Sequence, residues 1–138
     1  MMRPNGIARI LTAAASLLLL AATPQPLVLA KDTYFFVGGE YVKTPSGNVM
    51  DGQMYVHALI PWKVTHRYGI VFVTGRNATG TYYEGTPDGR EGWAQFFVRR
   101  GYRVYVTDQP ARGRSAYHPD LDGKLSGEVF GGGHAALP

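Results

Sequence analysis

The chain has no cysteine among its 138 residues, and this absence excludes several kinds of site. Disulfide bonds and thiolate metal centres cannot form, so a folded domain must be held together by a packed core. Lipid attachment through an N-terminal cysteine is excluded for the same reason. The four histidines, at positions 57, 66, 118 and 134, are not accompanied by clustered acidic residues. The sequence therefore predicts neither a metal site nor a cofactor.

A strong excess of charge of one sign is also missing. Fourteen Lys and Arg residues stand against ten Asp and Glu residues, a formal net charge of +4. The basic residues are scattered, with small clusters only at 99–103 and 112–114. Binding to the phosphate backbone requires a denser basic surface than this. No nucleic-acid partner is predicted, and the sequence indicates no oligomeric state.

The N-terminal region lacks an apolar run long enough to span a bilayer, which takes about 20 residues. The run from Ile10 to Ala22 is shorter, follows a basic start at Arg3 and Arg9, and is broken by two prolines before Ala30. This order is typical of a secretory signal peptide. We expect residues 1–30 to be a signal peptide cleaved near Ala30. The product would be secreted or periplasmic, with no stable membrane anchor after cleavage.

β-Prone residues dominate the region that follows. Residues 33–37 are aromatic and extended, and Gly38-Gly39 predicts a hairpin turn after them. A second turn is expected at 45–48. Residues 53–60 alternate as a half-buried strand, with His57 on the opposite face from the apolar residues, where we expect a surface side chain. The apolar run 69–73 lacks alternation and predicts a strand of a parallel sheet, covered on both faces.

A βαβ unit is predicted over residues 69–107. Residues 91–100 have helical spacing, with an aromatic stripe of Trp93, Phe96 and Phe97 that we expect in the core. Gly101 is expected to end this helix in a left-handed conformation. Residues 102–107 form the next strand, which should run parallel to 69–73. The following loop, 108–115, leaves the carboxyl end of that strand, the edge where α/β sheets build their sites.

The glycine-rich stretch after residue 73 allows two interpretations. A phosphate-binding loop needs Lys after its second glycine, but Thr81 follows Gly80, so an NTPase is excluded. Glycine directly after a buried strand suits an oxyanion hole, in which backbone N–H groups stabilise negative charge on a carbonyl oxygen. From local sequence alone, an ordinary strand-to-helix turn accounts for the same glycines.

Gly113-Arg114-Ser115 matches half of a Gly-x-Ser-x-Gly nucleophile elbow. Tyr117 occupies the position of the last glycine, and several residues, including Pro110, separate Ser115 from the preceding strand. An elbow requires its serine at the sharp turn between strand and helix. Ser115 is therefore not expected to be a nucleophile, and the sequence does not assemble a catalytic serine, histidine and acid.

Three segments together resemble the α/β-hydrolase superfamily, most closely a branch of exported bacterial esterases and their fungal relatives. They are TPDGR-x-GW at 86–93, RRGY at 99–102 and DQ-x-x-RGRS at 108–115. The resemblance covers roughly residues 34–122. It implies an α/β fold: an incomplete α/β-hydrolase sheet in which an N-terminal antiparallel hairpin precedes one βαβ unit. The domain would span 31–138, with 115–138 poorly ordered.

The resemblance also implies where the site lies. In the family a His-Gly pair ends the third strand, and the next residue donates an oxyanion-hole N–H; the matching positions are Thr74, Gly75 and Arg76. Gly75 and Arg76 are thus the oxyanion-hole candidates, although Thr74 replaces the histidine. The site-rim residues are Thr74 and, from the loop after the fourth strand, Asp108, Gly113 and Ser115, while Ala111 stands where the family has its first glycine.

The family's nucleophile, acid and base lie after the fifth strand, beyond the last residue of this sequence. No catalytic residue is therefore assigned, and we expect this polypeptide alone to be inactive and to aggregate through an exposed apolar strand. A small-molecule ester is the expected substrate of a longer form. Two alternatives remain: a non-catalytic exported α/β binding module, and a small β-rich domain with only local resemblance.

Overall fold

The computed structural model describes residues 25–75 and 78–123. Its strands are β1 (Leu29–Thr44), β2 (Gly47–Pro61), β3 (Ile70–Val73) and β4 (Val104–Asp108). Its helices are α2 (Thr81–Glu84), α3 (Trp93–Arg99) and α4 (Pro119–Asp122). Most of the predicted signal peptide lies outside the described residues, while Ala30 belongs to β1.

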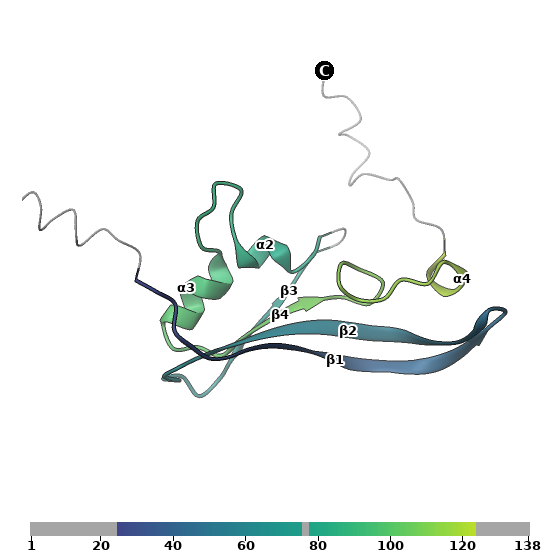
Figure 1. Ribbon diagram of the computed structural model, residues 1–138, viewed down its shortest axis with the longest axis horizontal. Coiled ribbons are helices and arrows are strands. Elements are labelled where there is room, and N and C mark those ends of the chain that lie inside the picture. Colours follow the sequence, from purple (N-terminus) through teal and green to yellow (C-terminus); the bar gives the residue numbers. More distant parts are fainter. Residues whose placement is uncertain (1–24, 76–77, 124–138) are drawn as a thin grey trace, which may run out of the picture.

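The strands form one mixed sheet in the order β1-β2-β4-β3. β1 pairs antiparallel with β2, β2 pairs antiparallel with β4, and β3 runs parallel to β4. Helix α3 connects β3 to β4, and α2 and α3 lie over the same face of the sheet (Figure 1). The predicted hairpin followed by a βαβ unit is thus present.

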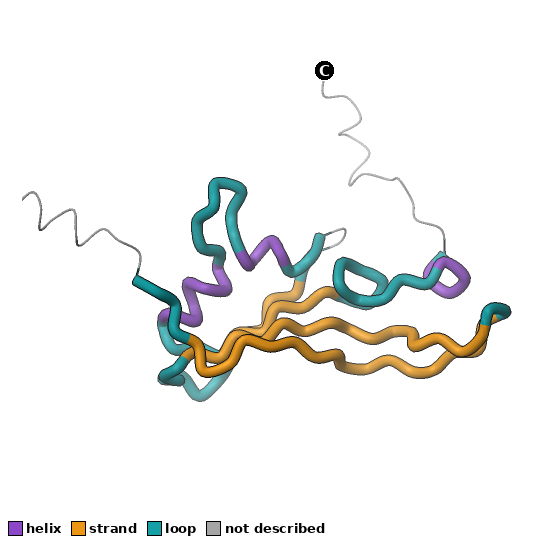
Figure 2. The backbone as a smooth tube through the Cα atoms, in the orientation of Figure 1, coloured by secondary structure: helices purple, strands orange, loops and turns teal. Residues whose placement is uncertain are grey.

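The hairpin turn predicted at Gly38-Gly39 is wrong. β1 continues through both glycines, whose φ angles are 69° and 84°, and Gly52 opposite them on β2 also has a positive φ of 69°. Glycines facing each other across a ladder change the backbone direction without reversing the chain. The reversal lies instead at Pro45 and Ser46, and β1 and β2 extend as a long arm beyond β4 (Figure 2).

The core lies between α3 and the central strands. Leu59 on β2 is the cross-strand partner of Val104 on β4, and α3 packs on this face through Ala94 and Val98, which are fully or almost fully buried. The predicted aromatic stripe is only partly in the core. Phe97 packs against it, but Trp93 and Phe96 are 62% and 45% exposed. Ala94 and Val98, four residues apart, occupy the helix face that meets the sheet, and Trp93 and Phe96, three residues apart, lie on the side that faces solvent.

The end of α3 confirms the predicted glycine stop. Gly101 has a φ of 83° and donates its N–H to the carbonyl of Val98 at 2.9 Å, while the N–H of Tyr102 reaches the carbonyl of Phe97 at 3.2 Å. These two bonds form a Schellman motif, in which a left-handed residue satisfies the last carbonyls of a helix. The motif turns the chain directly into β4.

The face of β3 that points away from the helices is open. Phe72 packs toward the core, and alternation along the strand places Val71 and Val73 on the opposite face, where they are 58% and 53% exposed. The expected cover on both faces of this strand is therefore not found in the described part of the chain. β3 is also an edge strand of the sheet, so both its backbone edge and this apolar face meet solvent.

Candidate functional site

The two segments expected to shape a site leave the sheet at the same edge. β3 ends at Val73 and β4 ends at Asp108, and Val73 is the parallel partner of Thr107. Thr74 and Gly75 therefore emerge beside the loop that begins at residue 109. Gly75 is exposed, Thr74 is 3% exposed, and Arg76 lies outside the described residues.

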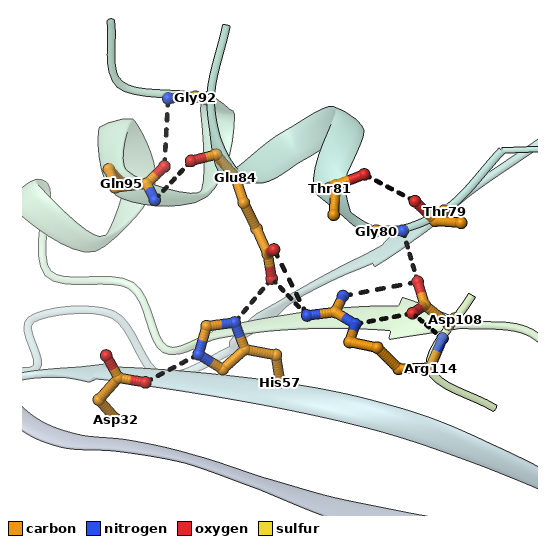
Figure 3. Close-up of polar contacts among 10 residues, drawn as sticks. All are labelled: Asp32, His57, Thr79, Gly80, Thr81, Glu84, Gly92, Gln95, Asp108 and Arg114. Atoms are coloured by element: carbon orange, nitrogen blue, oxygen red, sulfur yellow. Dashed lines mark hydrogen bonds and ion pairs between the residues drawn. The ribbon is translucent and has the colours of Figure 1, made fainter. Parts of the chain in front are cut away.

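Asp108 is the centre of this edge. Its side chain is fully buried; Oδ1 accepts the N–H of Gly80 at 2.5 Å, and Oδ2 accepts the backbone N–H and the Nε–H of Arg114 at 2.8 and 2.7 Å (Figure 3). Burial alone would raise the pKa of Asp108, but the hydrogen bonds from Arg114 and Gly80 outweigh it, so the pKa is lowered. One carboxylate thus joins β4, its following loop and the segment before α2.

Two glycines make this arrangement possible. A Cβ on Gly80 would lie 2.6 Å from Cγ1 of Val106 and 3.0 Å from Oδ1 of Asp108. Gly113 has a φ of 52°, and a Cβ there would lie 2.6 Å from Oδ2 of Asp108. No side chain fits at either position without moving the carboxylate, which explains why the loop contains Gly113.

Ala111 adopts a conformation that normally belongs to glycine. Its φ is 60°, and it alone among the non-glycine residues of the described segments has a positive φ. This is the position at which the family pattern has its first glycine. The loop therefore keeps the glycine-like backbone while carrying a side chain, which costs free energy.

Ser115 lies at the rim but is fully engaged in holding the loop. It is 5% exposed, donates its hydroxyl to the carbonyl of Asp108 at 2.6 Å and accepts the N–H of Tyr55 at 2.9 Å. These two bonds tie the loop to β2 and β4. The hydroxyl of Ser115 thus both donates and accepts a hydrogen bond within the protein.

His57 is the residue that sequence reasoning missed. Its side chain is 21% exposed and lies between two carboxylates, with Nε2 2.8 Å from Asp32 and Nδ1 2.6 Å from Glu84. Glu84 in turn accepts the Nη1–H of Arg114 at 3.2 Å, which extends the chain of charges to Asp108. The sequence predicted a surface position for His57. Its two partners lie on β1 and α2, 25 and 27 residues away, so local sequence does not reveal these contacts.

Burial alone would lower the pKa of His57. The hydrogen bonds to Asp32 and Glu84 and the negative charges of both groups oppose this effect, and the net result is a raised pKa. For Arg114, burial is likewise outweighed by Asp108 and Glu84, so its pKa rises further above the ordinary range. The cluster therefore favours the charged form of each of these two side chains.

Within residues 25–75 and 78–123, no group of three or more His, Asp and Glu side chains is placed to hold a metal ion. In the same residues, no helix has the length and apolar character needed to cross a bilayer.

No family model matches the chain, but comparison with known proteins finds similar ones, among them a secreted lipase and a bacterial esterase. Over 89 residues the chain is 43% identical to a protein of Fungal sp. named "Probable secreted lipase phiG", covering 64% of this chain and 22% of the lipase. A solved bacterial esterase is 42% identical, with a TM-score of 0.65 over 71% of this chain and 34% of the esterase. The chain thus spans about a fifth of the curated relative and a third of the solved one. The predicted resemblance to esterase-like hydrolases is confirmed by these two relatives, a probable secreted lipase and a bacterial esterase.

Proposed function

We propose that this chain forms the N-terminal part of an exported carboxylic ester hydrolase that acts on a small-molecule ester. Two observations support the proposal: the similarity to a secreted lipase and a bacterial esterase, and the match of the sheet to the esterase structure. The secretion named for the lipase also supports export of this chain.

The observation that carries the proposal is the common edge of β3 and β4. Gly75 follows β3 at this edge, beside the loop that Asp108 and Arg114 hold in place. Main-chain N–H groups at Gly75 and Arg76 would stabilise the oxyanion that forms when a serine attacks an ester carbonyl. The proposed donors are main-chain N–H groups, and a main-chain N–H does not require a particular side chain. Thr74 in place of the family's histidine is therefore compatible with this role.

The reacting serine is not supplied by the described residues. Ser115 is buried and bonded on both sides, and Ser46 lies in the hairpin turn, bonded to Thr44. We therefore propose that the nucleophile and its histidine come from additional polypeptide, and that the 138 residues alone do not hydrolyse esters.

The experiment compares Arg76→Pro, which removes the main-chain N–H, with Arg76→Ala, which keeps it. The protein is isolated as its host exports it, and hydrolysis of a short-chain aryl ester is measured alongside circular dichroism. We expect Arg76→Pro to lower kcat by about 10²–10³, the effect of removing one oxyanion-hole donor, with Arg76→Ala close to wild type. Equal losses in both folded variants would contradict the main-chain role.

Two further measurements test the binding-module alternative and the expected cleavage site. The coding sequence downstream of residue 138 should contain a Gly-x-Ser-x-Gly pattern. If this pattern is absent and the protein binds an ester without hydrolysing it, the non-catalytic binding module is supported instead. The mass of the exported protein tests cleavage near Ala30. Leu27 and Leu29 pack against the core, so a mass that retains them would place the cleavage site closer to the N-terminus.

A further inference from the structure

The contacts of His57 define its protonation state by simple counting of donors. Both ring nitrogens face carboxylate oxygens, at 2.8 Å on Asp32 and 2.6 Å on Glu84 (Figure 3). An ionised carboxylate only accepts hydrogen bonds, and a neutral imidazole carries a single N–H. Both contacts are therefore favourable only when His57 is an imidazolium. The neutral ring sets a lone pair against one of the two carboxylates.

The two carboxylates beside His57 differ in how easily each can move away from the imidazole ring. Asp32 on β1 is 60% exposed and can turn toward water. Glu84 on α2 is 19% exposed and is also held by Arg114 from the loop after β4. Tyr34 faces His57 across the β1–β2 ladder, and Val106 faces it from β4. His57 thus lies among two carboxylates, a tyrosine and an aliphatic side chain, and the guanidinium of Arg114 contacts Glu84, one of the two carboxylates.

Glu84 connects this cluster to the rim. It is the last residue of α2, the short helix that follows the segment leaving β3, and the N–H of Gly80 before that helix is held by Asp108. Gly80 and the helix that follows it are therefore anchored by Asp108 and by the contacts of Glu84. The carbonyl of Glu84 also accepts a bond from Gln95 at 2.8 Å, which does not depend on pH.

We propose that protonated His57 is a positioning residue that holds α2 against the sheet, so that the placement of α2 and of Gly80 before it depends on pH. When His57 loses its proton, one carboxylate contact becomes repulsive and α2 loses part of its attachment. The effect on structure follows from the contacts alone, whereas the effect on catalysis rests on the proposed function.

The direction of the pH dependence follows from the raised pKa of His57. A group whose pKa is higher in the folded protein stabilises it fully below its unfolded pKa, about 6.5 for histidine. That stabilisation is lost as the pH rises through the folded value. Attachment of α2 is therefore strongest in mildly acidic solution and weakest in alkaline solution.

The structural test uses the exported protein and three variants. His57→Lys keeps a cation that can donate to both acids at every pH used, His57→Gln has no titrating group, and His66→Gln is the matched control because His66 stacks on Tyr102 away from the cluster. We expect the Tm of wild type and His66→Gln to fall between pH 6 and 9 relative to that of His57→Lys. His57→Gln should lack this fall. NMR titration of the imidazole should give a pKa above 6.5.

The inference is overturned if His57 titrates at or below 6.5, or if His57→Lys and His57→Gln reproduce the wild-type pH dependence of Tm. The catalytic readout is the pH profile of kcat for ester hydrolysis, in which His57→Lys should keep more activity than wild type above the folded pKa, with KM little changed. Absence of hydrolysis together with a His57 pKa above 6.5 would refute the proposed function but not the structural part of this inference.

Discussion

Asp108 and Arg114, six residues apart, close a ring in which one carboxylate oxygen accepts both the backbone N–H and the side-chain Nε–H of the arginine, at 2.8 and 2.7 Å. The other oxygen of Asp108 accepts the N–H of Gly80. Asp108 is fully buried, so replacing one of its oxygens with an amide NH2 sets that group against an N–H donor, removes the charge that faces Arg114, and does so in a region with little access to water.

Asp108→Asn should therefore destabilise the protein by about 3–5 kcal/mol, the usual cost of removing one partner of a buried ion pair. Urea unfolding followed by circular dichroism measures the change. Asp88→Asn is the matched control, since Asp88 and its partner Arg90 are both exposed, and it should leave stability nearly unchanged.

The lowered pKa of Asp108 predicts a pH dependence of stability. The stabilisation that Asp108 contributes is present above about pH 3.9, the unfolded value, and is lost as the pH falls through the folded value. Equal acid sensitivity of wild type and Asp108→Asn would contradict this assignment.

Ala111→Gly should stabilise the protein by up to about 1 kcal/mol. The substitution removes the cost of a left-handed φ of 60° on a residue with a Cβ, and the greater freedom of glycine in the unfolded chain offsets part of this gain. Thermal unfolding measures the change. Ala116→Gly in the same loop, where φ is not positive, should be neutral or destabilising. A loss of stability in Ala111→Gly comparable to that in Ala116→Gly would show that the Ala111 side chain makes favourable contacts that outweigh its backbone conformation.

Ser115→Ala should reduce stability by about 1–3 kcal/mol, because the Asp108 carbonyl and the Tyr55 N–H are left without partners. In the proposed hydrolytic form of the protein, the variant should retain turnover of an aryl ester once it is folded. Ser46→Ala, in the exposed hairpin turn, is the control and should change stability by less than about 0.5 kcal/mol. A folded Ser115→Ala variant without any hydrolysis, next to an active wild type, would make Ser115 the nucleophile after all.

Substituting Val71 and Val73 with Lys together should suppress aggregation of the 138-residue polypeptide. Both side chains are more than half exposed on an edge strand, and lysine is a common means by which proteins protect such edges. Static light scattering at increasing concentration measures the effect. Tyr82→Lys adds a like charge at a side chain that is 73% exposed on α2, and should leave the scattering close to that of wild type. Equal suppression by Tyr82→Lys would assign the effect to net charge.

Much of the fold could be predicted because its signals are local. The apolar run 69–73, the helical spacing before Gly101 and the next β-prone run predict the βαβ unit, and the structure contains it. α2 was missed because it has only four residues inside a polar, glycine-rich stretch. The turn at Gly38-Gly39 was wrong because dipeptide signals do not include the third glycine, Gly52, on the opposite strand.

The candidate site was less accessible to sequence reasoning. The resemblance indicated Asp108, Gly113 and Ser115, but the contacts that organise them come from the packing of separate segments. His57 is the clearest case, since Asp32 lies 25 residues before it and Glu84 lies 27 residues after it. No local pattern links residues at such distances, and without that link a single histidine on a strand predicts only a surface position.

The long β1–β2 arm has a consequence for the order in which the chain folds. Its two strands are joined by a short turn, and hairpins of this kind form in about 1–10 μs. β4 joins β2 much later along the chain, since Tyr55 pairs with Asp108, and closing a longer loop costs more entropy. During synthesis the arm can therefore assemble first and serve as the template on which β4 docks. Until β4 has docked, the edge of β2 opposite β1 has unpaired backbone groups and can pair with an incorrect strand.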